Sequence, residues 1–171
     1  MKQFFVLFVV CLSLVAAPAM AQAQKIAYVD LQKALNLSSA GKEAKEKIKA
    51  KVQEYDADVQ QRQEELKKLK DDLEKQAMLL SEDARNAKER DYQQKVKEYQ
   101  RFTKDIQETL QQMDADFTRK ILEDLLKVAQ DFGKSEGYSM ILEKTESSIV
   151  YADESIDITD DVIKEFDTQG Q

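Results

Sequence analysis

The 171-residue sequence contains no histidine and no tryptophan, and it has only one cysteine, one proline and four glycines. Without histidine there is no Ser-His-Asp or Cys-His catalysis and no histidine-ligated metal site. The single cysteine, Cys11, cannot form an intramolecular disulfide or a zinc–thiolate cluster. Neither common type of phosphate-binding glycine loop occurs. We therefore expect no enzyme activity, no metal and no cofactor.

The N-terminal segment has the three parts of a secretory signal peptide. Lys2 precedes an apolar run over residues 4–15, and small residues follow this run. Cleavage after Ala21 or after Ala23 fits equally well. A retained membrane anchor is the alternative, but it needs roughly 20 apolar residues and this run is shorter. We expect residues 1–21, with cleavage at the latest after residue 23, to be removed on export to the periplasm.

Processing changes the composition of the chain. It removes the only cysteine, the only proline and Lys2, which leaves 25 basic and 33 acidic side chains and a formal net charge of −8. Since no disulfide can form, stability must come from packing and from association with other chains. The negative charge argues against nucleic-acid partners. No second apolar stretch is long enough to span a bilayer.

The middle of the chain is typical of a coiled coil. Residues 42–132 contain neither glycine nor proline. Apolar side chains recur there every three or four residues in two heptad seams. The first seam, with Arg62 and Gln76 in its gaps, comprises Ile48, Val52, Tyr55, Val59, Leu66, Leu69, Leu73 and Leu80. The second comprises Tyr92, Val96, Tyr99, Ile106, Leu110, Met113, Phe117, Ile121, Leu125, Val128 and Phe132.

The two seams do not share a phase, so the helix must slip or stop between them. Ser81 is a suitable N-cap, and two acidic residues follow it in the first turn of a new helix. We predict an antiparallel hairpin over residues 40–134 with its turn near 79–83. Its helices, Ala40–Leu80 and Glu82–Phe132, would be about 60 Å and about 75 Å long. The alternative is one continuous helix in a parallel dimer.

The flanking segments, residues 24–39 and 135–171, carry short strand candidates. Residues 25–30 form the first, and Asp30 is placed to cap a brief helix through Leu35. Residues 138–142 and 148–151 are two more strands around a polar turn. Thr159 is predicted to cap a terminal helix. These elements enclose little core in one chain, so we expect the strands to pair with other subunits.

The segment 153–161 is the one candidate for a metal site. Oxygen-bearing side chains alternate along it as in a calcium-binding loop. The sixth position is Ile158 instead of glycine, however, and the twelfth is Lys164 instead of glutamate. Helix capping explains these side chains better, and we expect no metal there.

Both ends of the mature chain resemble a known family. Ile26-Ala27-Tyr28-Val29-Asp30-Leu31-Gln32-Lys33-Ala34-Leu35 and the stretch from Gly137-Tyr138 to Asp157-Ile158-Thr159-Asp160-Asp161-Val162-Ile163 are similar to the two ends of Skp, the OmpH-like periplasmic chaperones. The order of strand, long hairpin, strands and short helix is also similar. The resemblance covers essentially the whole mature chain.

The resemblance implies an α+β fold in a homotrimer. Strands from three chains would form a β-barrel body, and three long helical hairpins would project from it as arms around a cavity. Such chaperones hold unfolded outer-membrane proteins there without ATP. The expected trimer interface comprises Ile26, Tyr28, Val29, Met140, Ile141, Leu142, Ile149, Val150 and Tyr151.

The sequence departs from the family in its charge. The best-known members are strongly basic, whereas residues 67–90 here carry seven basic and six acidic side chains. This near-neutral arm tip argues against electrostatic binding of lipopolysaccharide or a membrane surface. The candidate client-binding residues at the tip are Lys67, Lys68, Lys70, Lys75, Met78, Leu79, Arg85 and Lys88. The alternative function is a structural coiled-coil envelope protein that bridges a fixed, folded partner.

Overall fold

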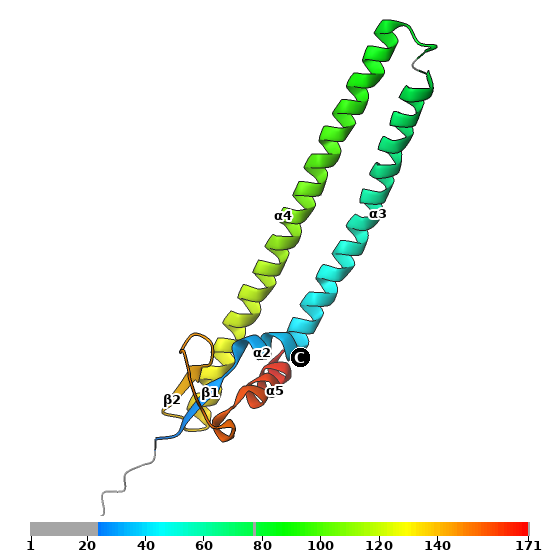
Figure 1. The fold of residues 1–171 in the computed structure, drawn as a ribbon. Helices are drawn as coiled ribbons and strands as arrows, with labels where there is room; N and C mark the ends of the chain where they lie inside the picture. Colours follow the sequence, from blue (N-terminus) through cyan, green and yellow to red (C-terminus); the bar gives the residue numbers. More distant parts are fainter. Residues whose placement is uncertain (1–23, 77, 171) are drawn as a thin grey trace, which may run out of the picture.

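The computed structural model describes residues 24–76 and 78–170 as a small body from which one long helical hairpin projects (Figure 1). Its elements are β1 (Ile26–Val29), α2 (Leu31–Leu37), α3 (Ser39–Gln76), α4 (Glu82–Ser135), β2 (Met140–Glu143), the 3-10 helix η1 (Glu154–Ile156) and α5 (Thr159–Gln169). The predicted fold class, a helical hairpin with a small strand-containing body, is confirmed. The predicted signal peptide lies outside the described residues.

The hairpin consists of α3 and α4, which lie side by side and antiparallel (Figure 1). With 38 and 54 residues they are about 57 Å and about 81 Å long at 1.5 Å per residue. Ser81 is the N-cap of α4, and its hydroxyl accepts a hydrogen bond of 3.4 Å from the N–H of Ala84. Helix α3 ends at Gln76, four residues before the predicted end at Leu80. The alternative of one continuous helix is wrong.

The two heptad seams face each other along the arm. Their side chains are half-buried over most of its length, because two helices alone leave part of each seam open to water. Tyr55 and Phe102 contact edge to face with ring centroids 6.5 Å apart, and Gln63 donates a 2.6 Å hydrogen bond to the hydroxyl of Tyr99. Arg62 occupies a gap in the first seam and places its guanidinium 4.1 Å from the centroid of Phe102.

The hydrophobic core lies in the body, at the base of the arm. There α4 buries Ile121, Leu125 and Val128 against the short elements. The remaining buried members of the core come from β1, α2, the start of α3, α4 and the start of α5: Ala27, Val29, Leu31, Ala34, Leu35, Ala44, Ala129, Ile158 and Val162. The arm therefore has a packed root and a thin, half-exposed shaft.

The sheet differs from the prediction. β1 and β2 pair in parallel, with Ile26 opposite Met140 and Val29 opposite Glu143, so the whole hairpin connects two neighbouring strands. The predicted strand at 148–151 is wrong for the single chain: Val150 is 100% exposed and Tyr151 is 83% exposed. No edge of β1 is free to receive this segment, since Ile158 donates a 3.0 Å hydrogen bond to the carbonyl of Tyr28 on the side away from β2.

The start of the terminal helix also differs. Thr159 is the first residue of α5 instead of its N-cap. The carboxylate of Asp157 accepts a 2.9 Å hydrogen bond from the N–H of Thr159, and the Thr159 hydroxyl accepts one from the N–H of Asp30, the residue after β1. Asp30 caps α2 as predicted and accepts a 2.7 Å hydrogen bond from the N–H of Lys33. Within the ranges that the structure describes, no helix carries an apolar stretch suited to crossing a membrane.

Candidate functional site

The nine residues predicted for subunit contacts fall into two groups. Tyr28 and Val29 are buried in the core of their own chain, and Ile141, Leu142 and Ile149 are half-buried. Ile26, Met140, Val150 and Tyr151 are exposed. The second strand, β2, has β1 on one side and, in the described parts of the chain, no strand on the other. Exposed apolar side chains and an open strand edge thus occur together on the body.

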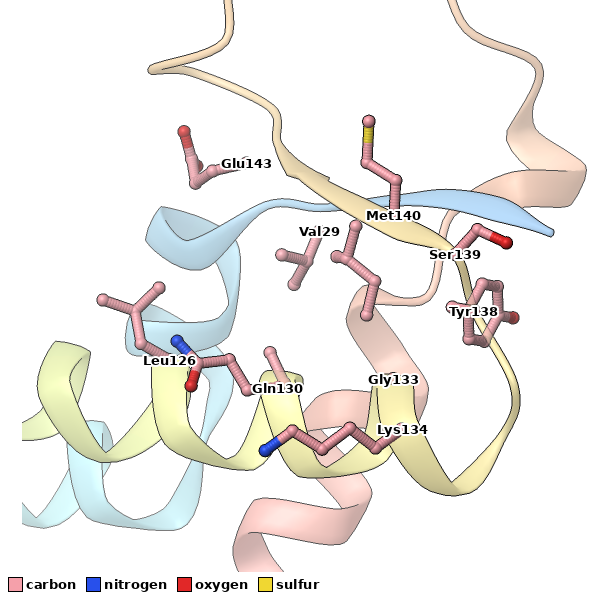
Figure 2. A pocket seen from close by; sticks show the side chains of 11 residues that line it. Val29, Leu126, Gln130, Gly133, Lys134, Tyr138, Ser139, Met140 and Glu143 are labelled. Atoms are coloured by element: carbon pink, nitrogen blue, oxygen red, sulfur yellow. The ribbon is translucent and has the colours of Figure 1, made fainter. Parts of the chain in front are cut away.

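A groove of about 390 Å³ runs between β2 and the last turns of α4 (Figure 2). Met140, Ser139 and Tyr138 line it from the strand side, while Leu126 and Gln130 line it from the helix. Gly133 forms part of the floor: a Cβ atom at this position would lie 2.6 Å from Cδ1 of Ile141, so a larger residue would displace the end of that side chain. Since Met140 is 52% exposed, the groove offers an apolar surface to another chain.

A partly buried polar network, which we call the latch, closes the body on the other side of β1. It consists of Tyr28, Asp30, Asp157 and Thr159. The hydroxyl of Thr159 donates to the carboxylate of Asp157 and accepts a 2.9 Å hydrogen bond from the N–H of Asp30. Thr159 is fully buried, so its hydroxyl has no access to water in place of these partners. The latch holds β1 against the start of α5.

The latch has a defined electrostatic character. Burial by itself raises the pKa of Asp157, but hydrogen bonds from the hydroxyl and the N–H of Thr159 and from Tyr28 outweigh it and hold that pKa below its ordinary value. Burial of the ring, and next the negative charge of Asp157, raise the pKa of Tyr28. The latch therefore requires an ionised Asp157 and a protonated Tyr28, both of which hold at neutral pH.

An ion pair and a hydrogen bond extend the latch toward the root of the arm. Lys33 on α2 lies 2.7 Å from a carboxylate oxygen of Asp160 on α5, and this hydrogen bond raises the pKa of Lys33. Near the other end of α5, Asp167 accepts a 2.9 Å hydrogen bond from the N–H of Ser39, the first residue of α3. The terminal helix thus connects the N-terminal strand with the beginning of the arm.

The arm tip carries two exposed apolar side chains. Met78 is 96% exposed and Leu79 is 85% exposed, and both lie in the turn between α3 and α4. The six basic residues predicted to bind clients are all exposed on the adjoining helix turns: Lys67, Lys68, Lys70, Lys75, Arg85 and Lys88. Lys88 donates to the side chain of Gln76 at 2.8 Å. These cations do not share one helix face, because residues one or two positions apart point in different directions.

The acidic segment 153–161, which was the candidate for a metal site, supplies side chains that form local hydrogen bonds. Asp153 accepts a 2.9 Å hydrogen bond from the N–H of Ser155 and caps η1, while Asp157 takes part in the latch. Within residues 24–76 and 78–170, no three potential ligands among Asp, Glu, His and Cys come together as a metal-binding group. Capping of η1 thus occupies the carboxylate of Asp153, and the latch occupies that of Asp157.

Comparison with known proteins places the chain in a family. A search of curated proteins finds no significant match. A solved structure of a candidate outer membrane chaperone (OmpH-like) from Caulobacter crescentus has the same fold, with a TM-score of 0.73 and 19% sequence identity over 85% of each chain. The family model described as outer membrane protein (OmpH-like) matches residues 25–166, nearly the whole described chain. The resemblance inferred from the two end motifs is confirmed, and the chain belongs to the OmpH-like family.

Proposed function

We propose that this protein is an ATP-independent periplasmic holdase, which binds unfolded outer-membrane proteins between its helical arms and prevents their aggregation. The observation that carries the proposal is the arm itself. Its shaft adds two half-buried seams and a long surface but no packed core. A single chain gains little stability from such an extension, which therefore suits contact with another molecule. The similarity to a candidate outer membrane chaperone supports the same conclusion.

The holdase is proposed to work as a homotrimer. A two-stranded sheet is marginal as an independent unit, and an open strand edge tends to pair with another chain. The exposed side chains of Val150 and Tyr151 and the groove beside Met140 supply the surfaces for this pairing. Three bodies joined in this way would bring three arms around one cavity.

Binding within the cavity is proposed to be weak at each point and to involve many points. The described arm surface is dominated by Lys, Glu, Gln and Asp, with apolar contact available at the half-buried seams and at Met78 and Leu79. Such a surface can solvate an unfolded chain without fixing its conformation. No single side chain should be indispensable, and neither ATP nor a metal is required.

The direct test measures aggregation of a urea-unfolded outer-membrane protein after dilution, by light scattering. A molar excess of mature trimer should suppress the rise in scattering in the absence of nucleotide. Equal aggregation with and without the protein would contradict the proposal. Light scattering of the protein alone should give about three times the chain mass, and a monomeric mass would contradict the proposed assembly.

The second candidate is a structural coiled coil that bridges other envelope components. The length of the arm, about 81 Å along α4, is the observation in its favour. A spacer should have one folded partner in fixed stoichiometry, whereas a holdase should capture a range of unfolded outer-membrane proteins. A pull-down from the periplasm under native conditions, followed by mass spectrometry, distinguishes these two outcomes.

A further inference from the structure

A second hollow of about 330 Å³, which we call the root pocket, lies where α2 crosses between the bases of α3 and α4 (Figure 1). Its walls are largely apolar and come from all three helices: Leu35 from α2, Ala44 and Ile48 from α3, and Phe117 and Ile121 from α4. Ile48 and Phe117 are only half-buried, so the pocket exposes apolar surface to water at the root of the arm. Apolar surface in this state favours a ligand that covers it.

Small residues on α3 create the root pocket. Gly41 and Ala44 both line it, and because they are three positions apart they share a face of the helix. A hydrogen atom and a methyl group leave open the space that longer side chains would fill. Gly41 is also required by the crossing itself, since a Cβ atom there would lie 1.7 Å from the carbonyl oxygen of Leu35. The close contact of α2 with α3 therefore leaves a hollow beside it.

The rim of the root pocket carries one group of each charge. Lys45 on α3 donates a 2.8 Å hydrogen bond to the side-chain carbonyl of Asn36, a neutral acceptor, and its ammonium has two further N–H donors. Asn36 is held in turn by a 2.8 Å hydrogen bond from its amide nitrogen to the carbonyl of Gln32. Asp114 on α4 is exposed and lines the same pocket. The rim thus offers hydrogen-bond donors on one helix and acceptors on the other.

We propose that the root pocket binds an apolar side chain of an unfolded polypeptide together with its adjoining peptide groups. Each peptide group has one carbonyl acceptor and one N–H donor, which need partners when they leave water. The ammonium of Lys45 complements the carbonyl, the carboxylate of Asp114 complements the N–H, and the apolar walls cover the side chain. A volume of about 330 Å³ suits a ligand of this size. This inference rests on the proposed holdase function and adds a defined client contact to it.

A second subunit docked in the groove beside Met140 would not cover the root pocket. Gln130 lines that groove, whereas Ile121 lines the root pocket. These two residues of α4 are nine positions apart, which is about two and a half turns, so they face opposite sides of the helix. The position of the pocket therefore favours an unfolded chain as its occupant over a second copy of this protein.

The experiment titrates N-acetylphenylalaninamide, which has one apolar side chain between two peptide groups, into the assembled mature protein. Methyl NMR of isoleucine-labelled protein follows Ile48 and Ile121 in the pocket, with Ile106 on the shaft as an internal control. We expect saturable shifts of the first two methyl signals, no shift of Ile106, and no shifts with N-acetylserinamide. Absence of shifts, equal shifts at Ile106, or contacts of the pocket methyl groups with a neighbouring subunit would overturn the inference.

Two matched variants test whether the pocket itself is occupied. Thr118→Trp places an indole at the half-buried wall of the root pocket and should weaken binding of the probe by about tenfold, because the indole takes the place of the bound side chain. Thr109→Trp makes the same change at an exposed position on the shaft and should keep the affinity of the unaltered protein. Equal affinity of the two variants would contradict binding in the pocket. The titration of the unaltered protein decides the question if Thr118→Trp does not fold.

Asp114→Ala tests the rim and keeps the apolar walls. Loss of the carboxylate should weaken binding of N-acetylphenylalaninamide severalfold, because the N–H of the probe then loses a charged acceptor. Asp105→Ala is the control, since Asp105 is exposed on the same helix outside the pocket. Equal affinity of these two variants would contradict the contact with the peptide group.

Failure of this inference is distinguishable from failure of the proposed function. If the probe does not bind but the protein suppresses aggregation, only the assignment of the root pocket is overturned. If the protein does not suppress aggregation, the proposed function fails, and the assignment of unfolded clients as occupants of the pocket fails with it.

Discussion

The backbone N–H of Asp30 donates a hydrogen bond of 2.9 Å to the hydroxyl of Thr159, which lies 129 residues further along the chain. Asp30 caps the helix that leads into the arm, and Thr159 opens the helix that ends the chain. The bond therefore joins the two flanks between which the whole hairpin is inserted. Because the chain must leave the body and return, this contact helps to fix the root of the arm.

Thr159→Val is expected to destabilise the body. Valine has nearly the shape of threonine but leaves the N–H of Asp30 without a partner and the carboxylate of Asp157 with one hydrogen bond fewer, at a cost of about 1–3 kcal/mol. Urea unfolding followed by circular dichroism measures the loss. Thr168→Val is the control, since its exposed hydroxyl donates only to the carbonyl of Lys164 within α5. Equal stability of the two variants would show that the latch contributes nothing.

The latch predicts a dependence of stability on pH. The folded state holds the pKa of Asp157 below its ordinary value of 3.8. The resulting stabilisation is fully present above that value and is lost as the pH falls through the lower, folded pKa. Asp157→Asn should reduce the free energy of unfolding by about 1–2 kcal/mol at pH 7. The difference in free energy of unfolding between the variant and the parent should then become smaller as the pH is lowered below the ordinary pKa of Asp157.

Urea titrations at a series of pH values between neutral and strongly acidic measure that narrowing. Asp56→Asn, at an exposed position on α3, serves as the control and should leave the stability profile nearly unchanged. A gap between Asp157→Asn and the parent that stays constant across the series would contradict an ionised role for Asp157.

The arm was predictable from the sequence because its determinants are local. Heptad spacing, the absence of glycine and proline, and Ser81 as a cap specify two helices and a turn without reference to the rest of the chain. Phe102 was missed because it lies one position before the residue that the seam's spacing requires. Its partial burial comes from contacts across the hairpin with Tyr55 and Arg62.

The body was less predictable because its pairing is non-local. Residues 148–151 have strand-like composition, but a strand also needs a partner. β1 has both edges occupied, and the described part of the chain does not place this segment on the open edge of β2. The parallel pairing of β1 with β2 depends on the arm returning to its starting point. Thr159 could be recognised as a helix-start residue from the sequence, but its bond to Asp30 spans the whole hairpin and has no local pattern.

Gly41→Ala is expected to disrupt the junction between α2 and α3. A Cβ atom at this position would lie 1.7 Å from the carbonyl oxygen of Leu35, which is backbone and cannot rotate away. The two helices must therefore separate, and we expect a loss of about 3 kcal/mol or more, as for a strongly overpacked site. Thermal unfolding measures the effect. Gly170→Ala, where the nearest atom is 3.5 Å away, should change little.

Val150→Asp together with Tyr151→Asp should prevent assembly. Both side chains are exposed in the single chain, so the substitutions leave its core intact. In the proposed trimer they would bury charges without partners, which is strongly unfavourable. Light scattering should show a fall from about three chain masses to one. Leu79→Asp, equally exposed but at the arm tip, should remain trimeric, and a trimeric Val150/Tyr151 variant would exclude this segment from the interface.

The arm tip allows apolar and electrostatic capture of clients to be compared directly. Met78→Ser with Leu79→Ser should leave the fold unchanged, because both side chains are almost fully exposed. If clients bury them, the loss of apolar contact should weaken binding by about tenfold, measured by fluorescence titration with an unfolded outer-membrane protein. Lys67→Ser with Lys68→Ser is the matched pair on α3, since those cations are also exposed. The tip of this chain is nearly neutral, so we expect the lysine pair to lose little affinity. If the lysine pair instead loses more affinity than the Met78/Leu79 pair, and affinity falls steeply with added salt, then clients bind mainly through the positive charges of the tip.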